Sequence, residues 1–88
     1  MGVEHQMGMA DPRLTAQAAM AAIDRMQSYP VGPQLMAAGV LLLMVCGKYG
    51  TRPSEVLTYT ENLLLSEDAR ILELRAVRAY IDDELNHK

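Results

Sequence analysis

The sequence contains neither Phe nor Trp, and its aromatic residues are limited to four tyrosines. The 50% of residues that are hydrophobic are therefore almost entirely aliphatic side chains and methionine, which favour packed helices over sheets. At 88 residues the chain is also too short to divide into several cores. We predict a small all-α protein with a single helical domain.

Cysteine and histidine are equally scarce. The single Cys46 cannot form an internal disulfide and lies in an apolar segment, so we expect a buried thiol in a reducing compartment. His5 and His87 lie near opposite ends of the sequence and form no constellation for nucleophilic or acid–base chemistry. Methionines next to His5, at Met7 and Met9, could bind a soft metal, but a mobile tail explains them more simply. We expect no enzyme activity, cofactor or metal.

The chain has no excess of basic charge. Its net charge is −3 and its pI about 5.2, which does not favour nucleic acids or anionic lipids as partners. Residues 1–10 lack the basic stretch followed by an apolar stretch that marks a secretory signal. We therefore expect a cytoplasmic protein, with residues 1–10 as a disordered leader and residues 11–88 as the domain.

An uncharged, apolar run at residues 35–46, LMAAGVLLLMVC, is the most distinctive segment present. Twelve helical residues rise about 18 Å, less than the roughly 30 Å hydrocarbon core of a bilayer, which argues against a membrane span. A helix that is apolar on every side is a central or interface helix. We predict a homodimer in which this helix contributes Leu35, Gly39, Leu41, Leu42, Met44 and Cys46 to the interface.

Helix-start and helix-stop signals divide the chain clearly. Asp11 before Pro12 is typical of a helix start, and Gly50 is typical of a helix end. Pro53 begins another helix, capped by Thr51 or by the residue after it, while residues 66–68 are either a turn or an acidic first turn. We expect four helices, with the apolar one at the centre, at residues 11–29, 33–49, 53–65 and 67–86.

The second and third predicted helices resemble a helix-turn-helix motif. In that arrangement the side chains facing DNA would be Lys48, Arg52, Ser54 and Thr58. Residues 30–65 carry two basic and two acidic side chains, whereas binding to the phosphate backbone needs several cations. The sequence therefore favours a plain helical corner, and nucleic acid is not an expected partner.

Charged side chains mark the last predicted helix. Arg75 and Arg78 lie one helical turn apart, and three carboxylates follow at Asp82, Asp83 and Glu84, at the negative end of the helix dipole. These five residues are candidates for contact with a protein partner or a second subunit. Ordinary solvated surface is the alternative interpretation.

Three segments between about residues 36 and 85 follow one another as LLLMVCGKYG, PSEVLTYTENLL and ELRAVRAYIDDEL. In this order they resemble a group of small uncharacterised helical proteins encoded in tailed-phage and prophage genomes. The shared positions are mostly apolar, so the resemblance implies a fold and carries no catalytic or cofactor residues. It also implies a context in which small acidic phage proteins bind and alter a host or phage protein, including defence systems. We expect such an interaction module, acting as an inhibitor, with a helix-turn-helix transcriptional regulator as the alternative.

Overall fold

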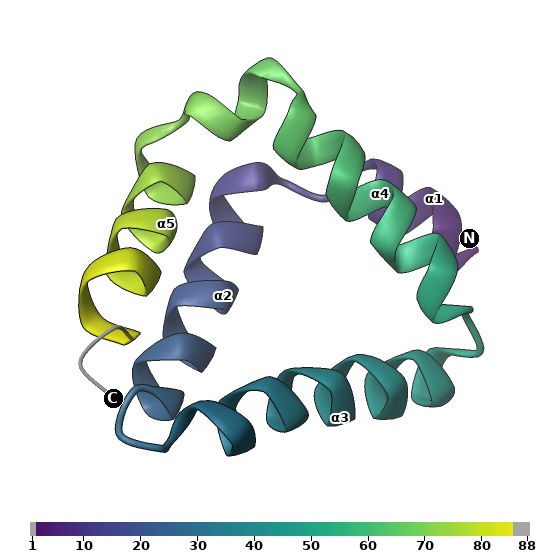
Figure 1. Ribbon diagram of the computed structural model, residues 1–88. Helices are drawn as coiled ribbons and strands as arrows, with labels where there is room; N and C mark the ends of the chain where they lie inside the picture. The colour runs from purple at the N-terminus through teal and green to yellow at the C-terminus, as the bar shows by residue number, and fades with distance from the viewer. Residues whose placement is uncertain (1, 86–88) are drawn as a thin grey trace.

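The computed structural model describes residues 2–85, which are helical with short connections and contain no strand (Figure 1). The prediction of an all-α protein is confirmed. In chain order the elements are α1 (Val3–Gly8), α2 (Pro12–Met26), α3 (Val31–Tyr49), α4 (Pro53–Leu65), the 3₁₀ turn η1 (Glu67–Arg70) and α5 (Leu72–Glu84).

Several helix ends lie where the sequence predicts them. The Asp11 carboxylate caps α2 by accepting a hydrogen bond from the backbone N–H of Arg13 at 2.8 Å. At the end of α3, Gly50 has the left-handed conformation that glycine adopts without steric cost, with φ 67°. The backbone N–H of Thr51 then donates to the carbonyl of Cys46 at 3.1 Å, which closes the helix. Helix α4 coincides with the predicted third helix.

Other boundaries differ from the prediction. The helix expected at residues 67–86 is two elements, because Ile71 has an extended backbone with φ −62° and ψ 150°. The Ser66 hydroxyl accepts a hydrogen bond from the N–H of Asp68 at 3.2 Å and so initiates η1. Helix α2 ends at Met26, before Tyr29, and α3 begins at Val31, ahead of the expected start at residue 33.

The expectation of a disordered leader is wrong for residues 3–8, which form α1. This short helix packs against α4, and a Cβ atom placed on Gly8 would lie 3.5 Å from Cε1 of Tyr59. A helix of six residues is not stable alone in water, so its signal in the sequence is weak and the contact with α4 supports it.

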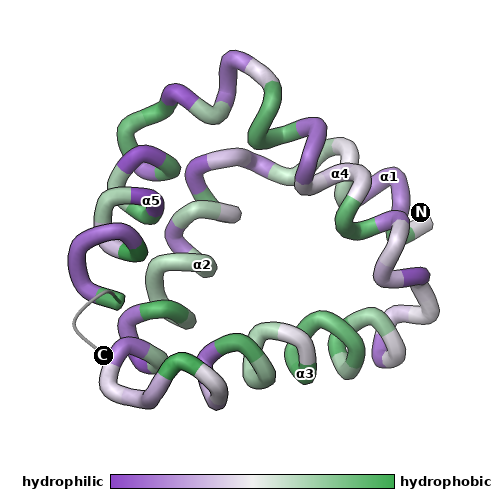
Figure 2. Tube along the Cα trace, in the orientation of Figure 1, coloured by the Kyte–Doolittle hydropathy of each residue, from purple (hydrophilic) through white to green (hydrophobic). Residues whose placement is uncertain are grey.

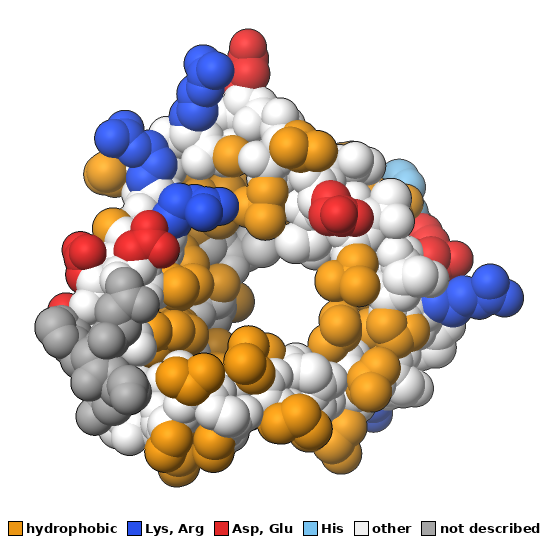
Figure 3. Space-filling view, in the orientation of Figure 1, with side chains coloured by type: hydrophobic (Ala, Val, Ile, Leu, Met, Phe, Trp, Pro, Cys, Tyr) orange, Lys and Arg blue, Asp and Glu red, His pale blue; other side chains and the backbone are white. Residues whose placement is uncertain are grey.

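The helices form an open, flattened ring (Figure 1), with principal extents of 41, 28 and 18 Å. Helices α2 and α5 lie side by side and run in the same direction. Arg13 Nε is 3.3 Å from Glu73 Oε2 near the start of both helices, and Tyr80 donates to Asp24 Oδ1 at 3.0 Å further along. Helices α3 and α4 form the other sides, and apolar side chains surround the opening in the middle (Figure 3).

A single copy of the chain has almost no core. Within the described residues, Ala16 and Cys46 are the hydrophobic residues that are fully buried. The solvent-accessible surface is 6744 Å², whereas a folded monomer of this mass exposes about 5,100 Å². Within one copy of the chain, α3 is therefore not at the centre as the sequence predicts. It forms one side of the ring, and most of its surface is exposed.

Replacing Tyr80 with Phe tests the pairing of α2 and α5. Desolvation, the hydrogen bond to Asp24, and the negative charges of Asp24 and Glu84 all raise the pKa of Tyr80 above its ordinary value. Because the pKa is raised in the folded state, the protonated hydroxyl of Tyr80 stabilises the fold below about pH 10. This stabilisation is lost as the pH rises through the folded pKa. We expect the wild type to lose stability relative to Tyr80→Phe in this alkaline range, as measured by urea unfolding at a series of pH values. An identical pH profile for both proteins would contradict the contact.

Candidate functional site: the exposed helix α3

The surface of α3 is apolar and open to solvent. Figure 2 shows hydrophobic residues along most of this helix, and Figure 3 shows apolar side chains projecting along the same edge of the molecule. Exposed positions occur on every side of the helix, so no single face is covered by the rest of the ring. The large hydrophobic residues exposed here are Val31, Leu35, Met36, Val40, Leu41, Leu43, Met44, Val45 and Tyr49.

Most of the predicted interface residues are available for contact, and one is not. Leu35 and Met44 are each about 70% exposed, and Leu41 and Gly39 are exposed as well. Leu42 is half-buried. Cys46 is only 3% exposed, so its assignment to an interface between chains is wrong. The chain turns a corner after Gly50, and α4 contacts α3 beyond this turn.

The full length of α3 changes the argument about membranes. Its 19 residues rise about 28 Å, close to the roughly 30 Å hydrocarbon core, so the short uncharged run no longer excludes a span by length. The helix also has the apolar composition of a possible membrane span, with 11% of it buried. The arrangement of the other helices must therefore decide what covers α3.

Gln34 fixes the corner between α2 and α3, and sequence reasoning overlooked it. Its Nε2 donates hydrogen bonds to the backbone carbonyls of Tyr29 at 2.7 Å and Met26 at 3.1 Å, and the residue is 7% exposed. The carbonyl of Met26 lies at the end of α2 and that of Tyr29 lies three residues beyond it, where the helix no longer supplies N–H donors. A glutamine in an apolar helix after two prolines was the available signal, since a buried amide needs hydrogen-bond partners.

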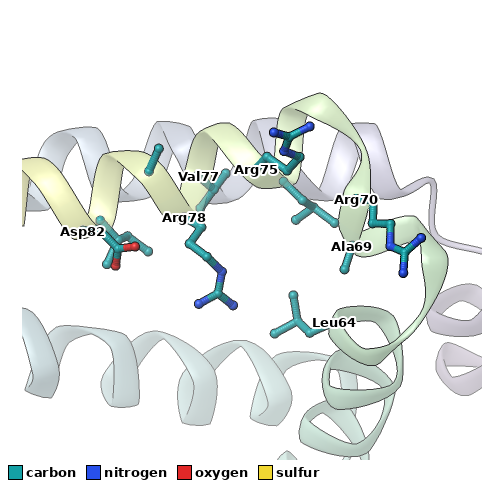
Figure 4. Close-up of a pocket in the computed structure, with 10 residues that line it drawn as sticks. Leu64, Ala69, Arg70, Arg75, Val77, Arg78 and Asp82 are labelled. Atoms are coloured by element: carbon teal, nitrogen blue, oxygen red, sulfur yellow. The ribbon is translucent and has the colours of Figure 1, made fainter.

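The predicted contact residues of α5 separate into two groups. Arg75, Arg78 and Asp82 line a groove between α5 and the end of α4 (Figure 4). Asp83 and Glu84 are exposed but do not line that groove. The structure thus brings the two arginines together with one of the three carboxylates.

The four residues proposed for DNA contact are all exposed. Ser54 and Thr58 lie one turn apart on α4, and the Thr58 hydroxyl donates to the carbonyl of Ser54 at 2.9 Å. That donor is therefore occupied within the helix. Lys48 and Arg52 remain the two cations of the corner, as counted from the sequence.

Neither a search for metal-binding side chains among the described residues nor a comparison with known proteins identifies a further site. Residues 2–85 contain no group of three or more His, Cys, Asp or Glu side chains that could hold a metal ion. His87 lies outside the described residues. No protein-family model, curated protein or solved structure matches the chain. The surfaces of the molecule itself are therefore the features from which its function is inferred.

Proposed function

We propose that this protein is a small acidic interaction module that forms a homodimer through α3 and binds and inhibits a host or phage protein in the bacterial cytoplasm. The observation that carries the proposal is the continuous apolar exposure of α3. Monomeric proteins rarely expose contiguous apolar patches larger than a few hundred Å², and larger patches are typical of interaction sites.

The exposed area supports a second copy as the cover. The chain exposes about 1,600 Å² more than a monomer of its mass. Stable interfaces bury about 800 Å² on each partner, and obligate homodimers bury more and are more hydrophobic. Contact between two α3 helices would remove apolar surface of this kind from both chains.

The connections of α3 favour a protein partner over a bilayer. If α3 crossed a membrane alone, α2 and α4 would lie on opposite sides. Helix α5 follows α4 after only a short turn and packs along α2, so α4 would have to cross back. Its 13 residues rise about 20 Å, too little for the hydrocarbon core, and it carries Glu55 and Glu61. Each charge at the bilayer centre costs about 3 kcal/mol.

A vesicle flotation assay distinguishes a protein partner of α3 from a lipid bilayer. We expect the full-length protein, mixed with vesicles of neutral and anionic phospholipid, to stay at the bottom of a density gradient. Co-flotation with the vesicles would contradict a protein-covered α3. A soluble protein whose exposed α3 binds no vesicle would support the proposal.

The inhibitory part of the proposal needs a defined partner. Affinity purification from a bacterial lysate, followed by mass spectrometry, identifies candidates, and the activity of each is then measured with and without the protein. Loss of the partner's activity is the expected result. Enrichment of no protein over an unrelated acidic control would contradict it.

A helix-turn-helix regulator is the second candidate, favoured by the exposure of Lys48, Arg52, Ser54 and Thr58 at the corner of α3 and α4. Non-specific binding to random duplex DNA at low salt is its least demanding test, because phosphate contacts supply that affinity. We expect no binding, since the corner offers two cations. Salt-dependent binding that Arg52→Gln weakens would favour the regulator.

A further inference from the structure

A groove of about 670 Å³ lies where the end of α4, η1 and α5 meet. Its apolar floor consists of Leu64 from α4 together with Leu74, Val77 and Ile81 from α5. Figure 4 shows Leu64 and Arg78 reaching from their two helices toward the same space. No residue of α3 lines the groove, so the groove and the proposed dimer surface consist of different residues.

Three arginines border this apolar floor: Arg70, Arg75 and Arg78. All three are exposed, and no ion pair joins any of them to a carboxylate within residues 2–85. The ion pair found in this part of the chain, between Arg13 and Glu73, lies toward α2. One carboxylate, Asp82, also lines the groove, so its apolar surface is bordered by three arginines and one acid. This is a local excess of positive charge in a chain that is acidic as a whole.

We propose that this groove binds an acidic amphipathic helix of the partner protein. Apolar side chains spaced three and four residues apart on that helix would cover Leu64, Leu74 and Ile81, and carboxylates beside them would pair with Arg75 and Arg78. Helix-in-groove recognition uses this spacing, and arginine binds carboxylates through two parallel hydrogen bonds. The inference rests on the proposed function as an interaction module and names the chemistry of its partner.

Charge complementarity distinguishes this occupant from the α3 helix of a second copy. Residues 31–49 contain no Asp or Glu, and their one charged side chain is Lys48. Packing such a helix into the groove would leave the arginines without partners and would add a further cation. Repulsion between like charges at an interface lowers the affinity for such a partner.

A designed peptide provides a direct test with the full-length protein. The probe is a fluorescein-labelled helix of about five turns, with leucines at the helical spacing and glutamates on either side; the matched probe has glutamine in place of every glutamate. We expect the glutamate peptide to bind with salt-dependent affinity and the glutamine peptide to bind at least tenfold more weakly, measured by fluorescence anisotropy. Two exposed ion pairs that each contribute about threefold give this factor.

Two double variants of equal charge locate the site. Arg75→Gln/Arg78→Gln removes two groove arginines while retaining residues that form helices well. Arg25→Gln/Arg52→Gln removes two exposed arginines that do not line the groove. We expect the first variant to bind the glutamate peptide about tenfold more weakly, and the second to bind like the wild type.

Three results would overturn the inference. The first is equal binding of the two peptides, or no binding of either. The second is an equal effect of the two double variants. The third is arginine-dependent binding to anionic vesicles without peptide binding, which would assign the groove to a lipid headgroup. The oligomeric state of Arg75→Gln/Arg78→Gln is measured in parallel. If the peptide test fails while this variant self-associates like the wild type, the proposal for the groove is rejected and the proposal of an α3 dimer is unaffected.

Discussion

Replacing Met44 with Glu is expected to convert the self-associated protein into a monomer and to weaken self-association at least 100-fold. Met44 is about 70% exposed on α3, on the surface that we assign to the second copy. A dimer with two-fold symmetry contains the substituted position twice, and each copy would place an unpaired carboxylate in an apolar contact. A loss of this size is typical of a central interface residue.

The substitution leaves the helix itself intact. Glutamate forms helices well, and a Glu at position 44 would lie one turn before Lys48, an arrangement that stabilises a helix slightly. Leu72→Glu is the matched control, because Leu72 is also highly exposed, at 76%, and begins α5, where an acidic residue suits the helix dipole. Light scattering during size-exclusion chromatography gives the mass of each. Equal masses for Met44→Glu and the wild type would contradict the assignment of the α3 surface.

Replacing Gln34 with Ala is expected to lower the free energy of unfolding by about 1–3 kcal/mol. The side-chain amide donates to the carbonyls of Met26 and Tyr29, and alanine would remove both hydrogen bonds from this part-buried corner. The carbonyl of Met26 would keep the backbone N–H of Tyr29 as its donor. Urea unfolding followed by circular dichroism measures the change. Variant and wild type must be compared at one protein concentration, because self-association contributes to the measured stability.

Two further variants distinguish the loss of the Gln34 hydrogen bonds from the general effect of such substitutions on helix stability. Gln17→Ala changes the same residue type at an exposed site of α2, and we expect a change within about 0.5 kcal/mol. Gln34→Glu would place a carboxylate beside the two carbonyl oxygens, which raises its pKa in the folded state. Its stability should therefore improve as the pH falls through this raised pKa and reach its full value below about 4.3, the ordinary pKa of glutamate, because the protonated acid can donate. Equal stability of Gln34→Ala and Gln17→Ala would show that the corner does not depend on this amide.

Local signals in the sequence predict several of the helix ends. Asp11 caps α2, Gly50 ends α3 in the left-handed conformation, and α4 has its predicted bounds. These features depend on one or two residues and their backbone geometry. The break at Ile71 is also local, but Ser66 signals either a turn or a helix start, so the sequence leaves both open.

The arrangement of the helices and the candidate sites depends on contacts between distant residues. Nothing near Asp24 in the sequence indicates its hydrogen bond with Tyr80, and α1 requires α4 to be folded beside it. The apolar run predicts an interface helix, yet it cannot show that Cys46 is buried within its own chain. Similarly, Arg75 and Arg78 are recognisable as charged surface, but their groove exists only once Leu64 is brought to α5.

Sedimentation equilibrium of the wild-type chain, from low to high micromolar concentration in the absence of detergent, tests the central claim most directly. The claim is that a second copy covers the apolar surface of α3. We expect the mass to be at least twice the 9.7 kDa of one chain at the higher concentrations. A mass of one chain across the whole range, with helical structure retained, would contradict the account.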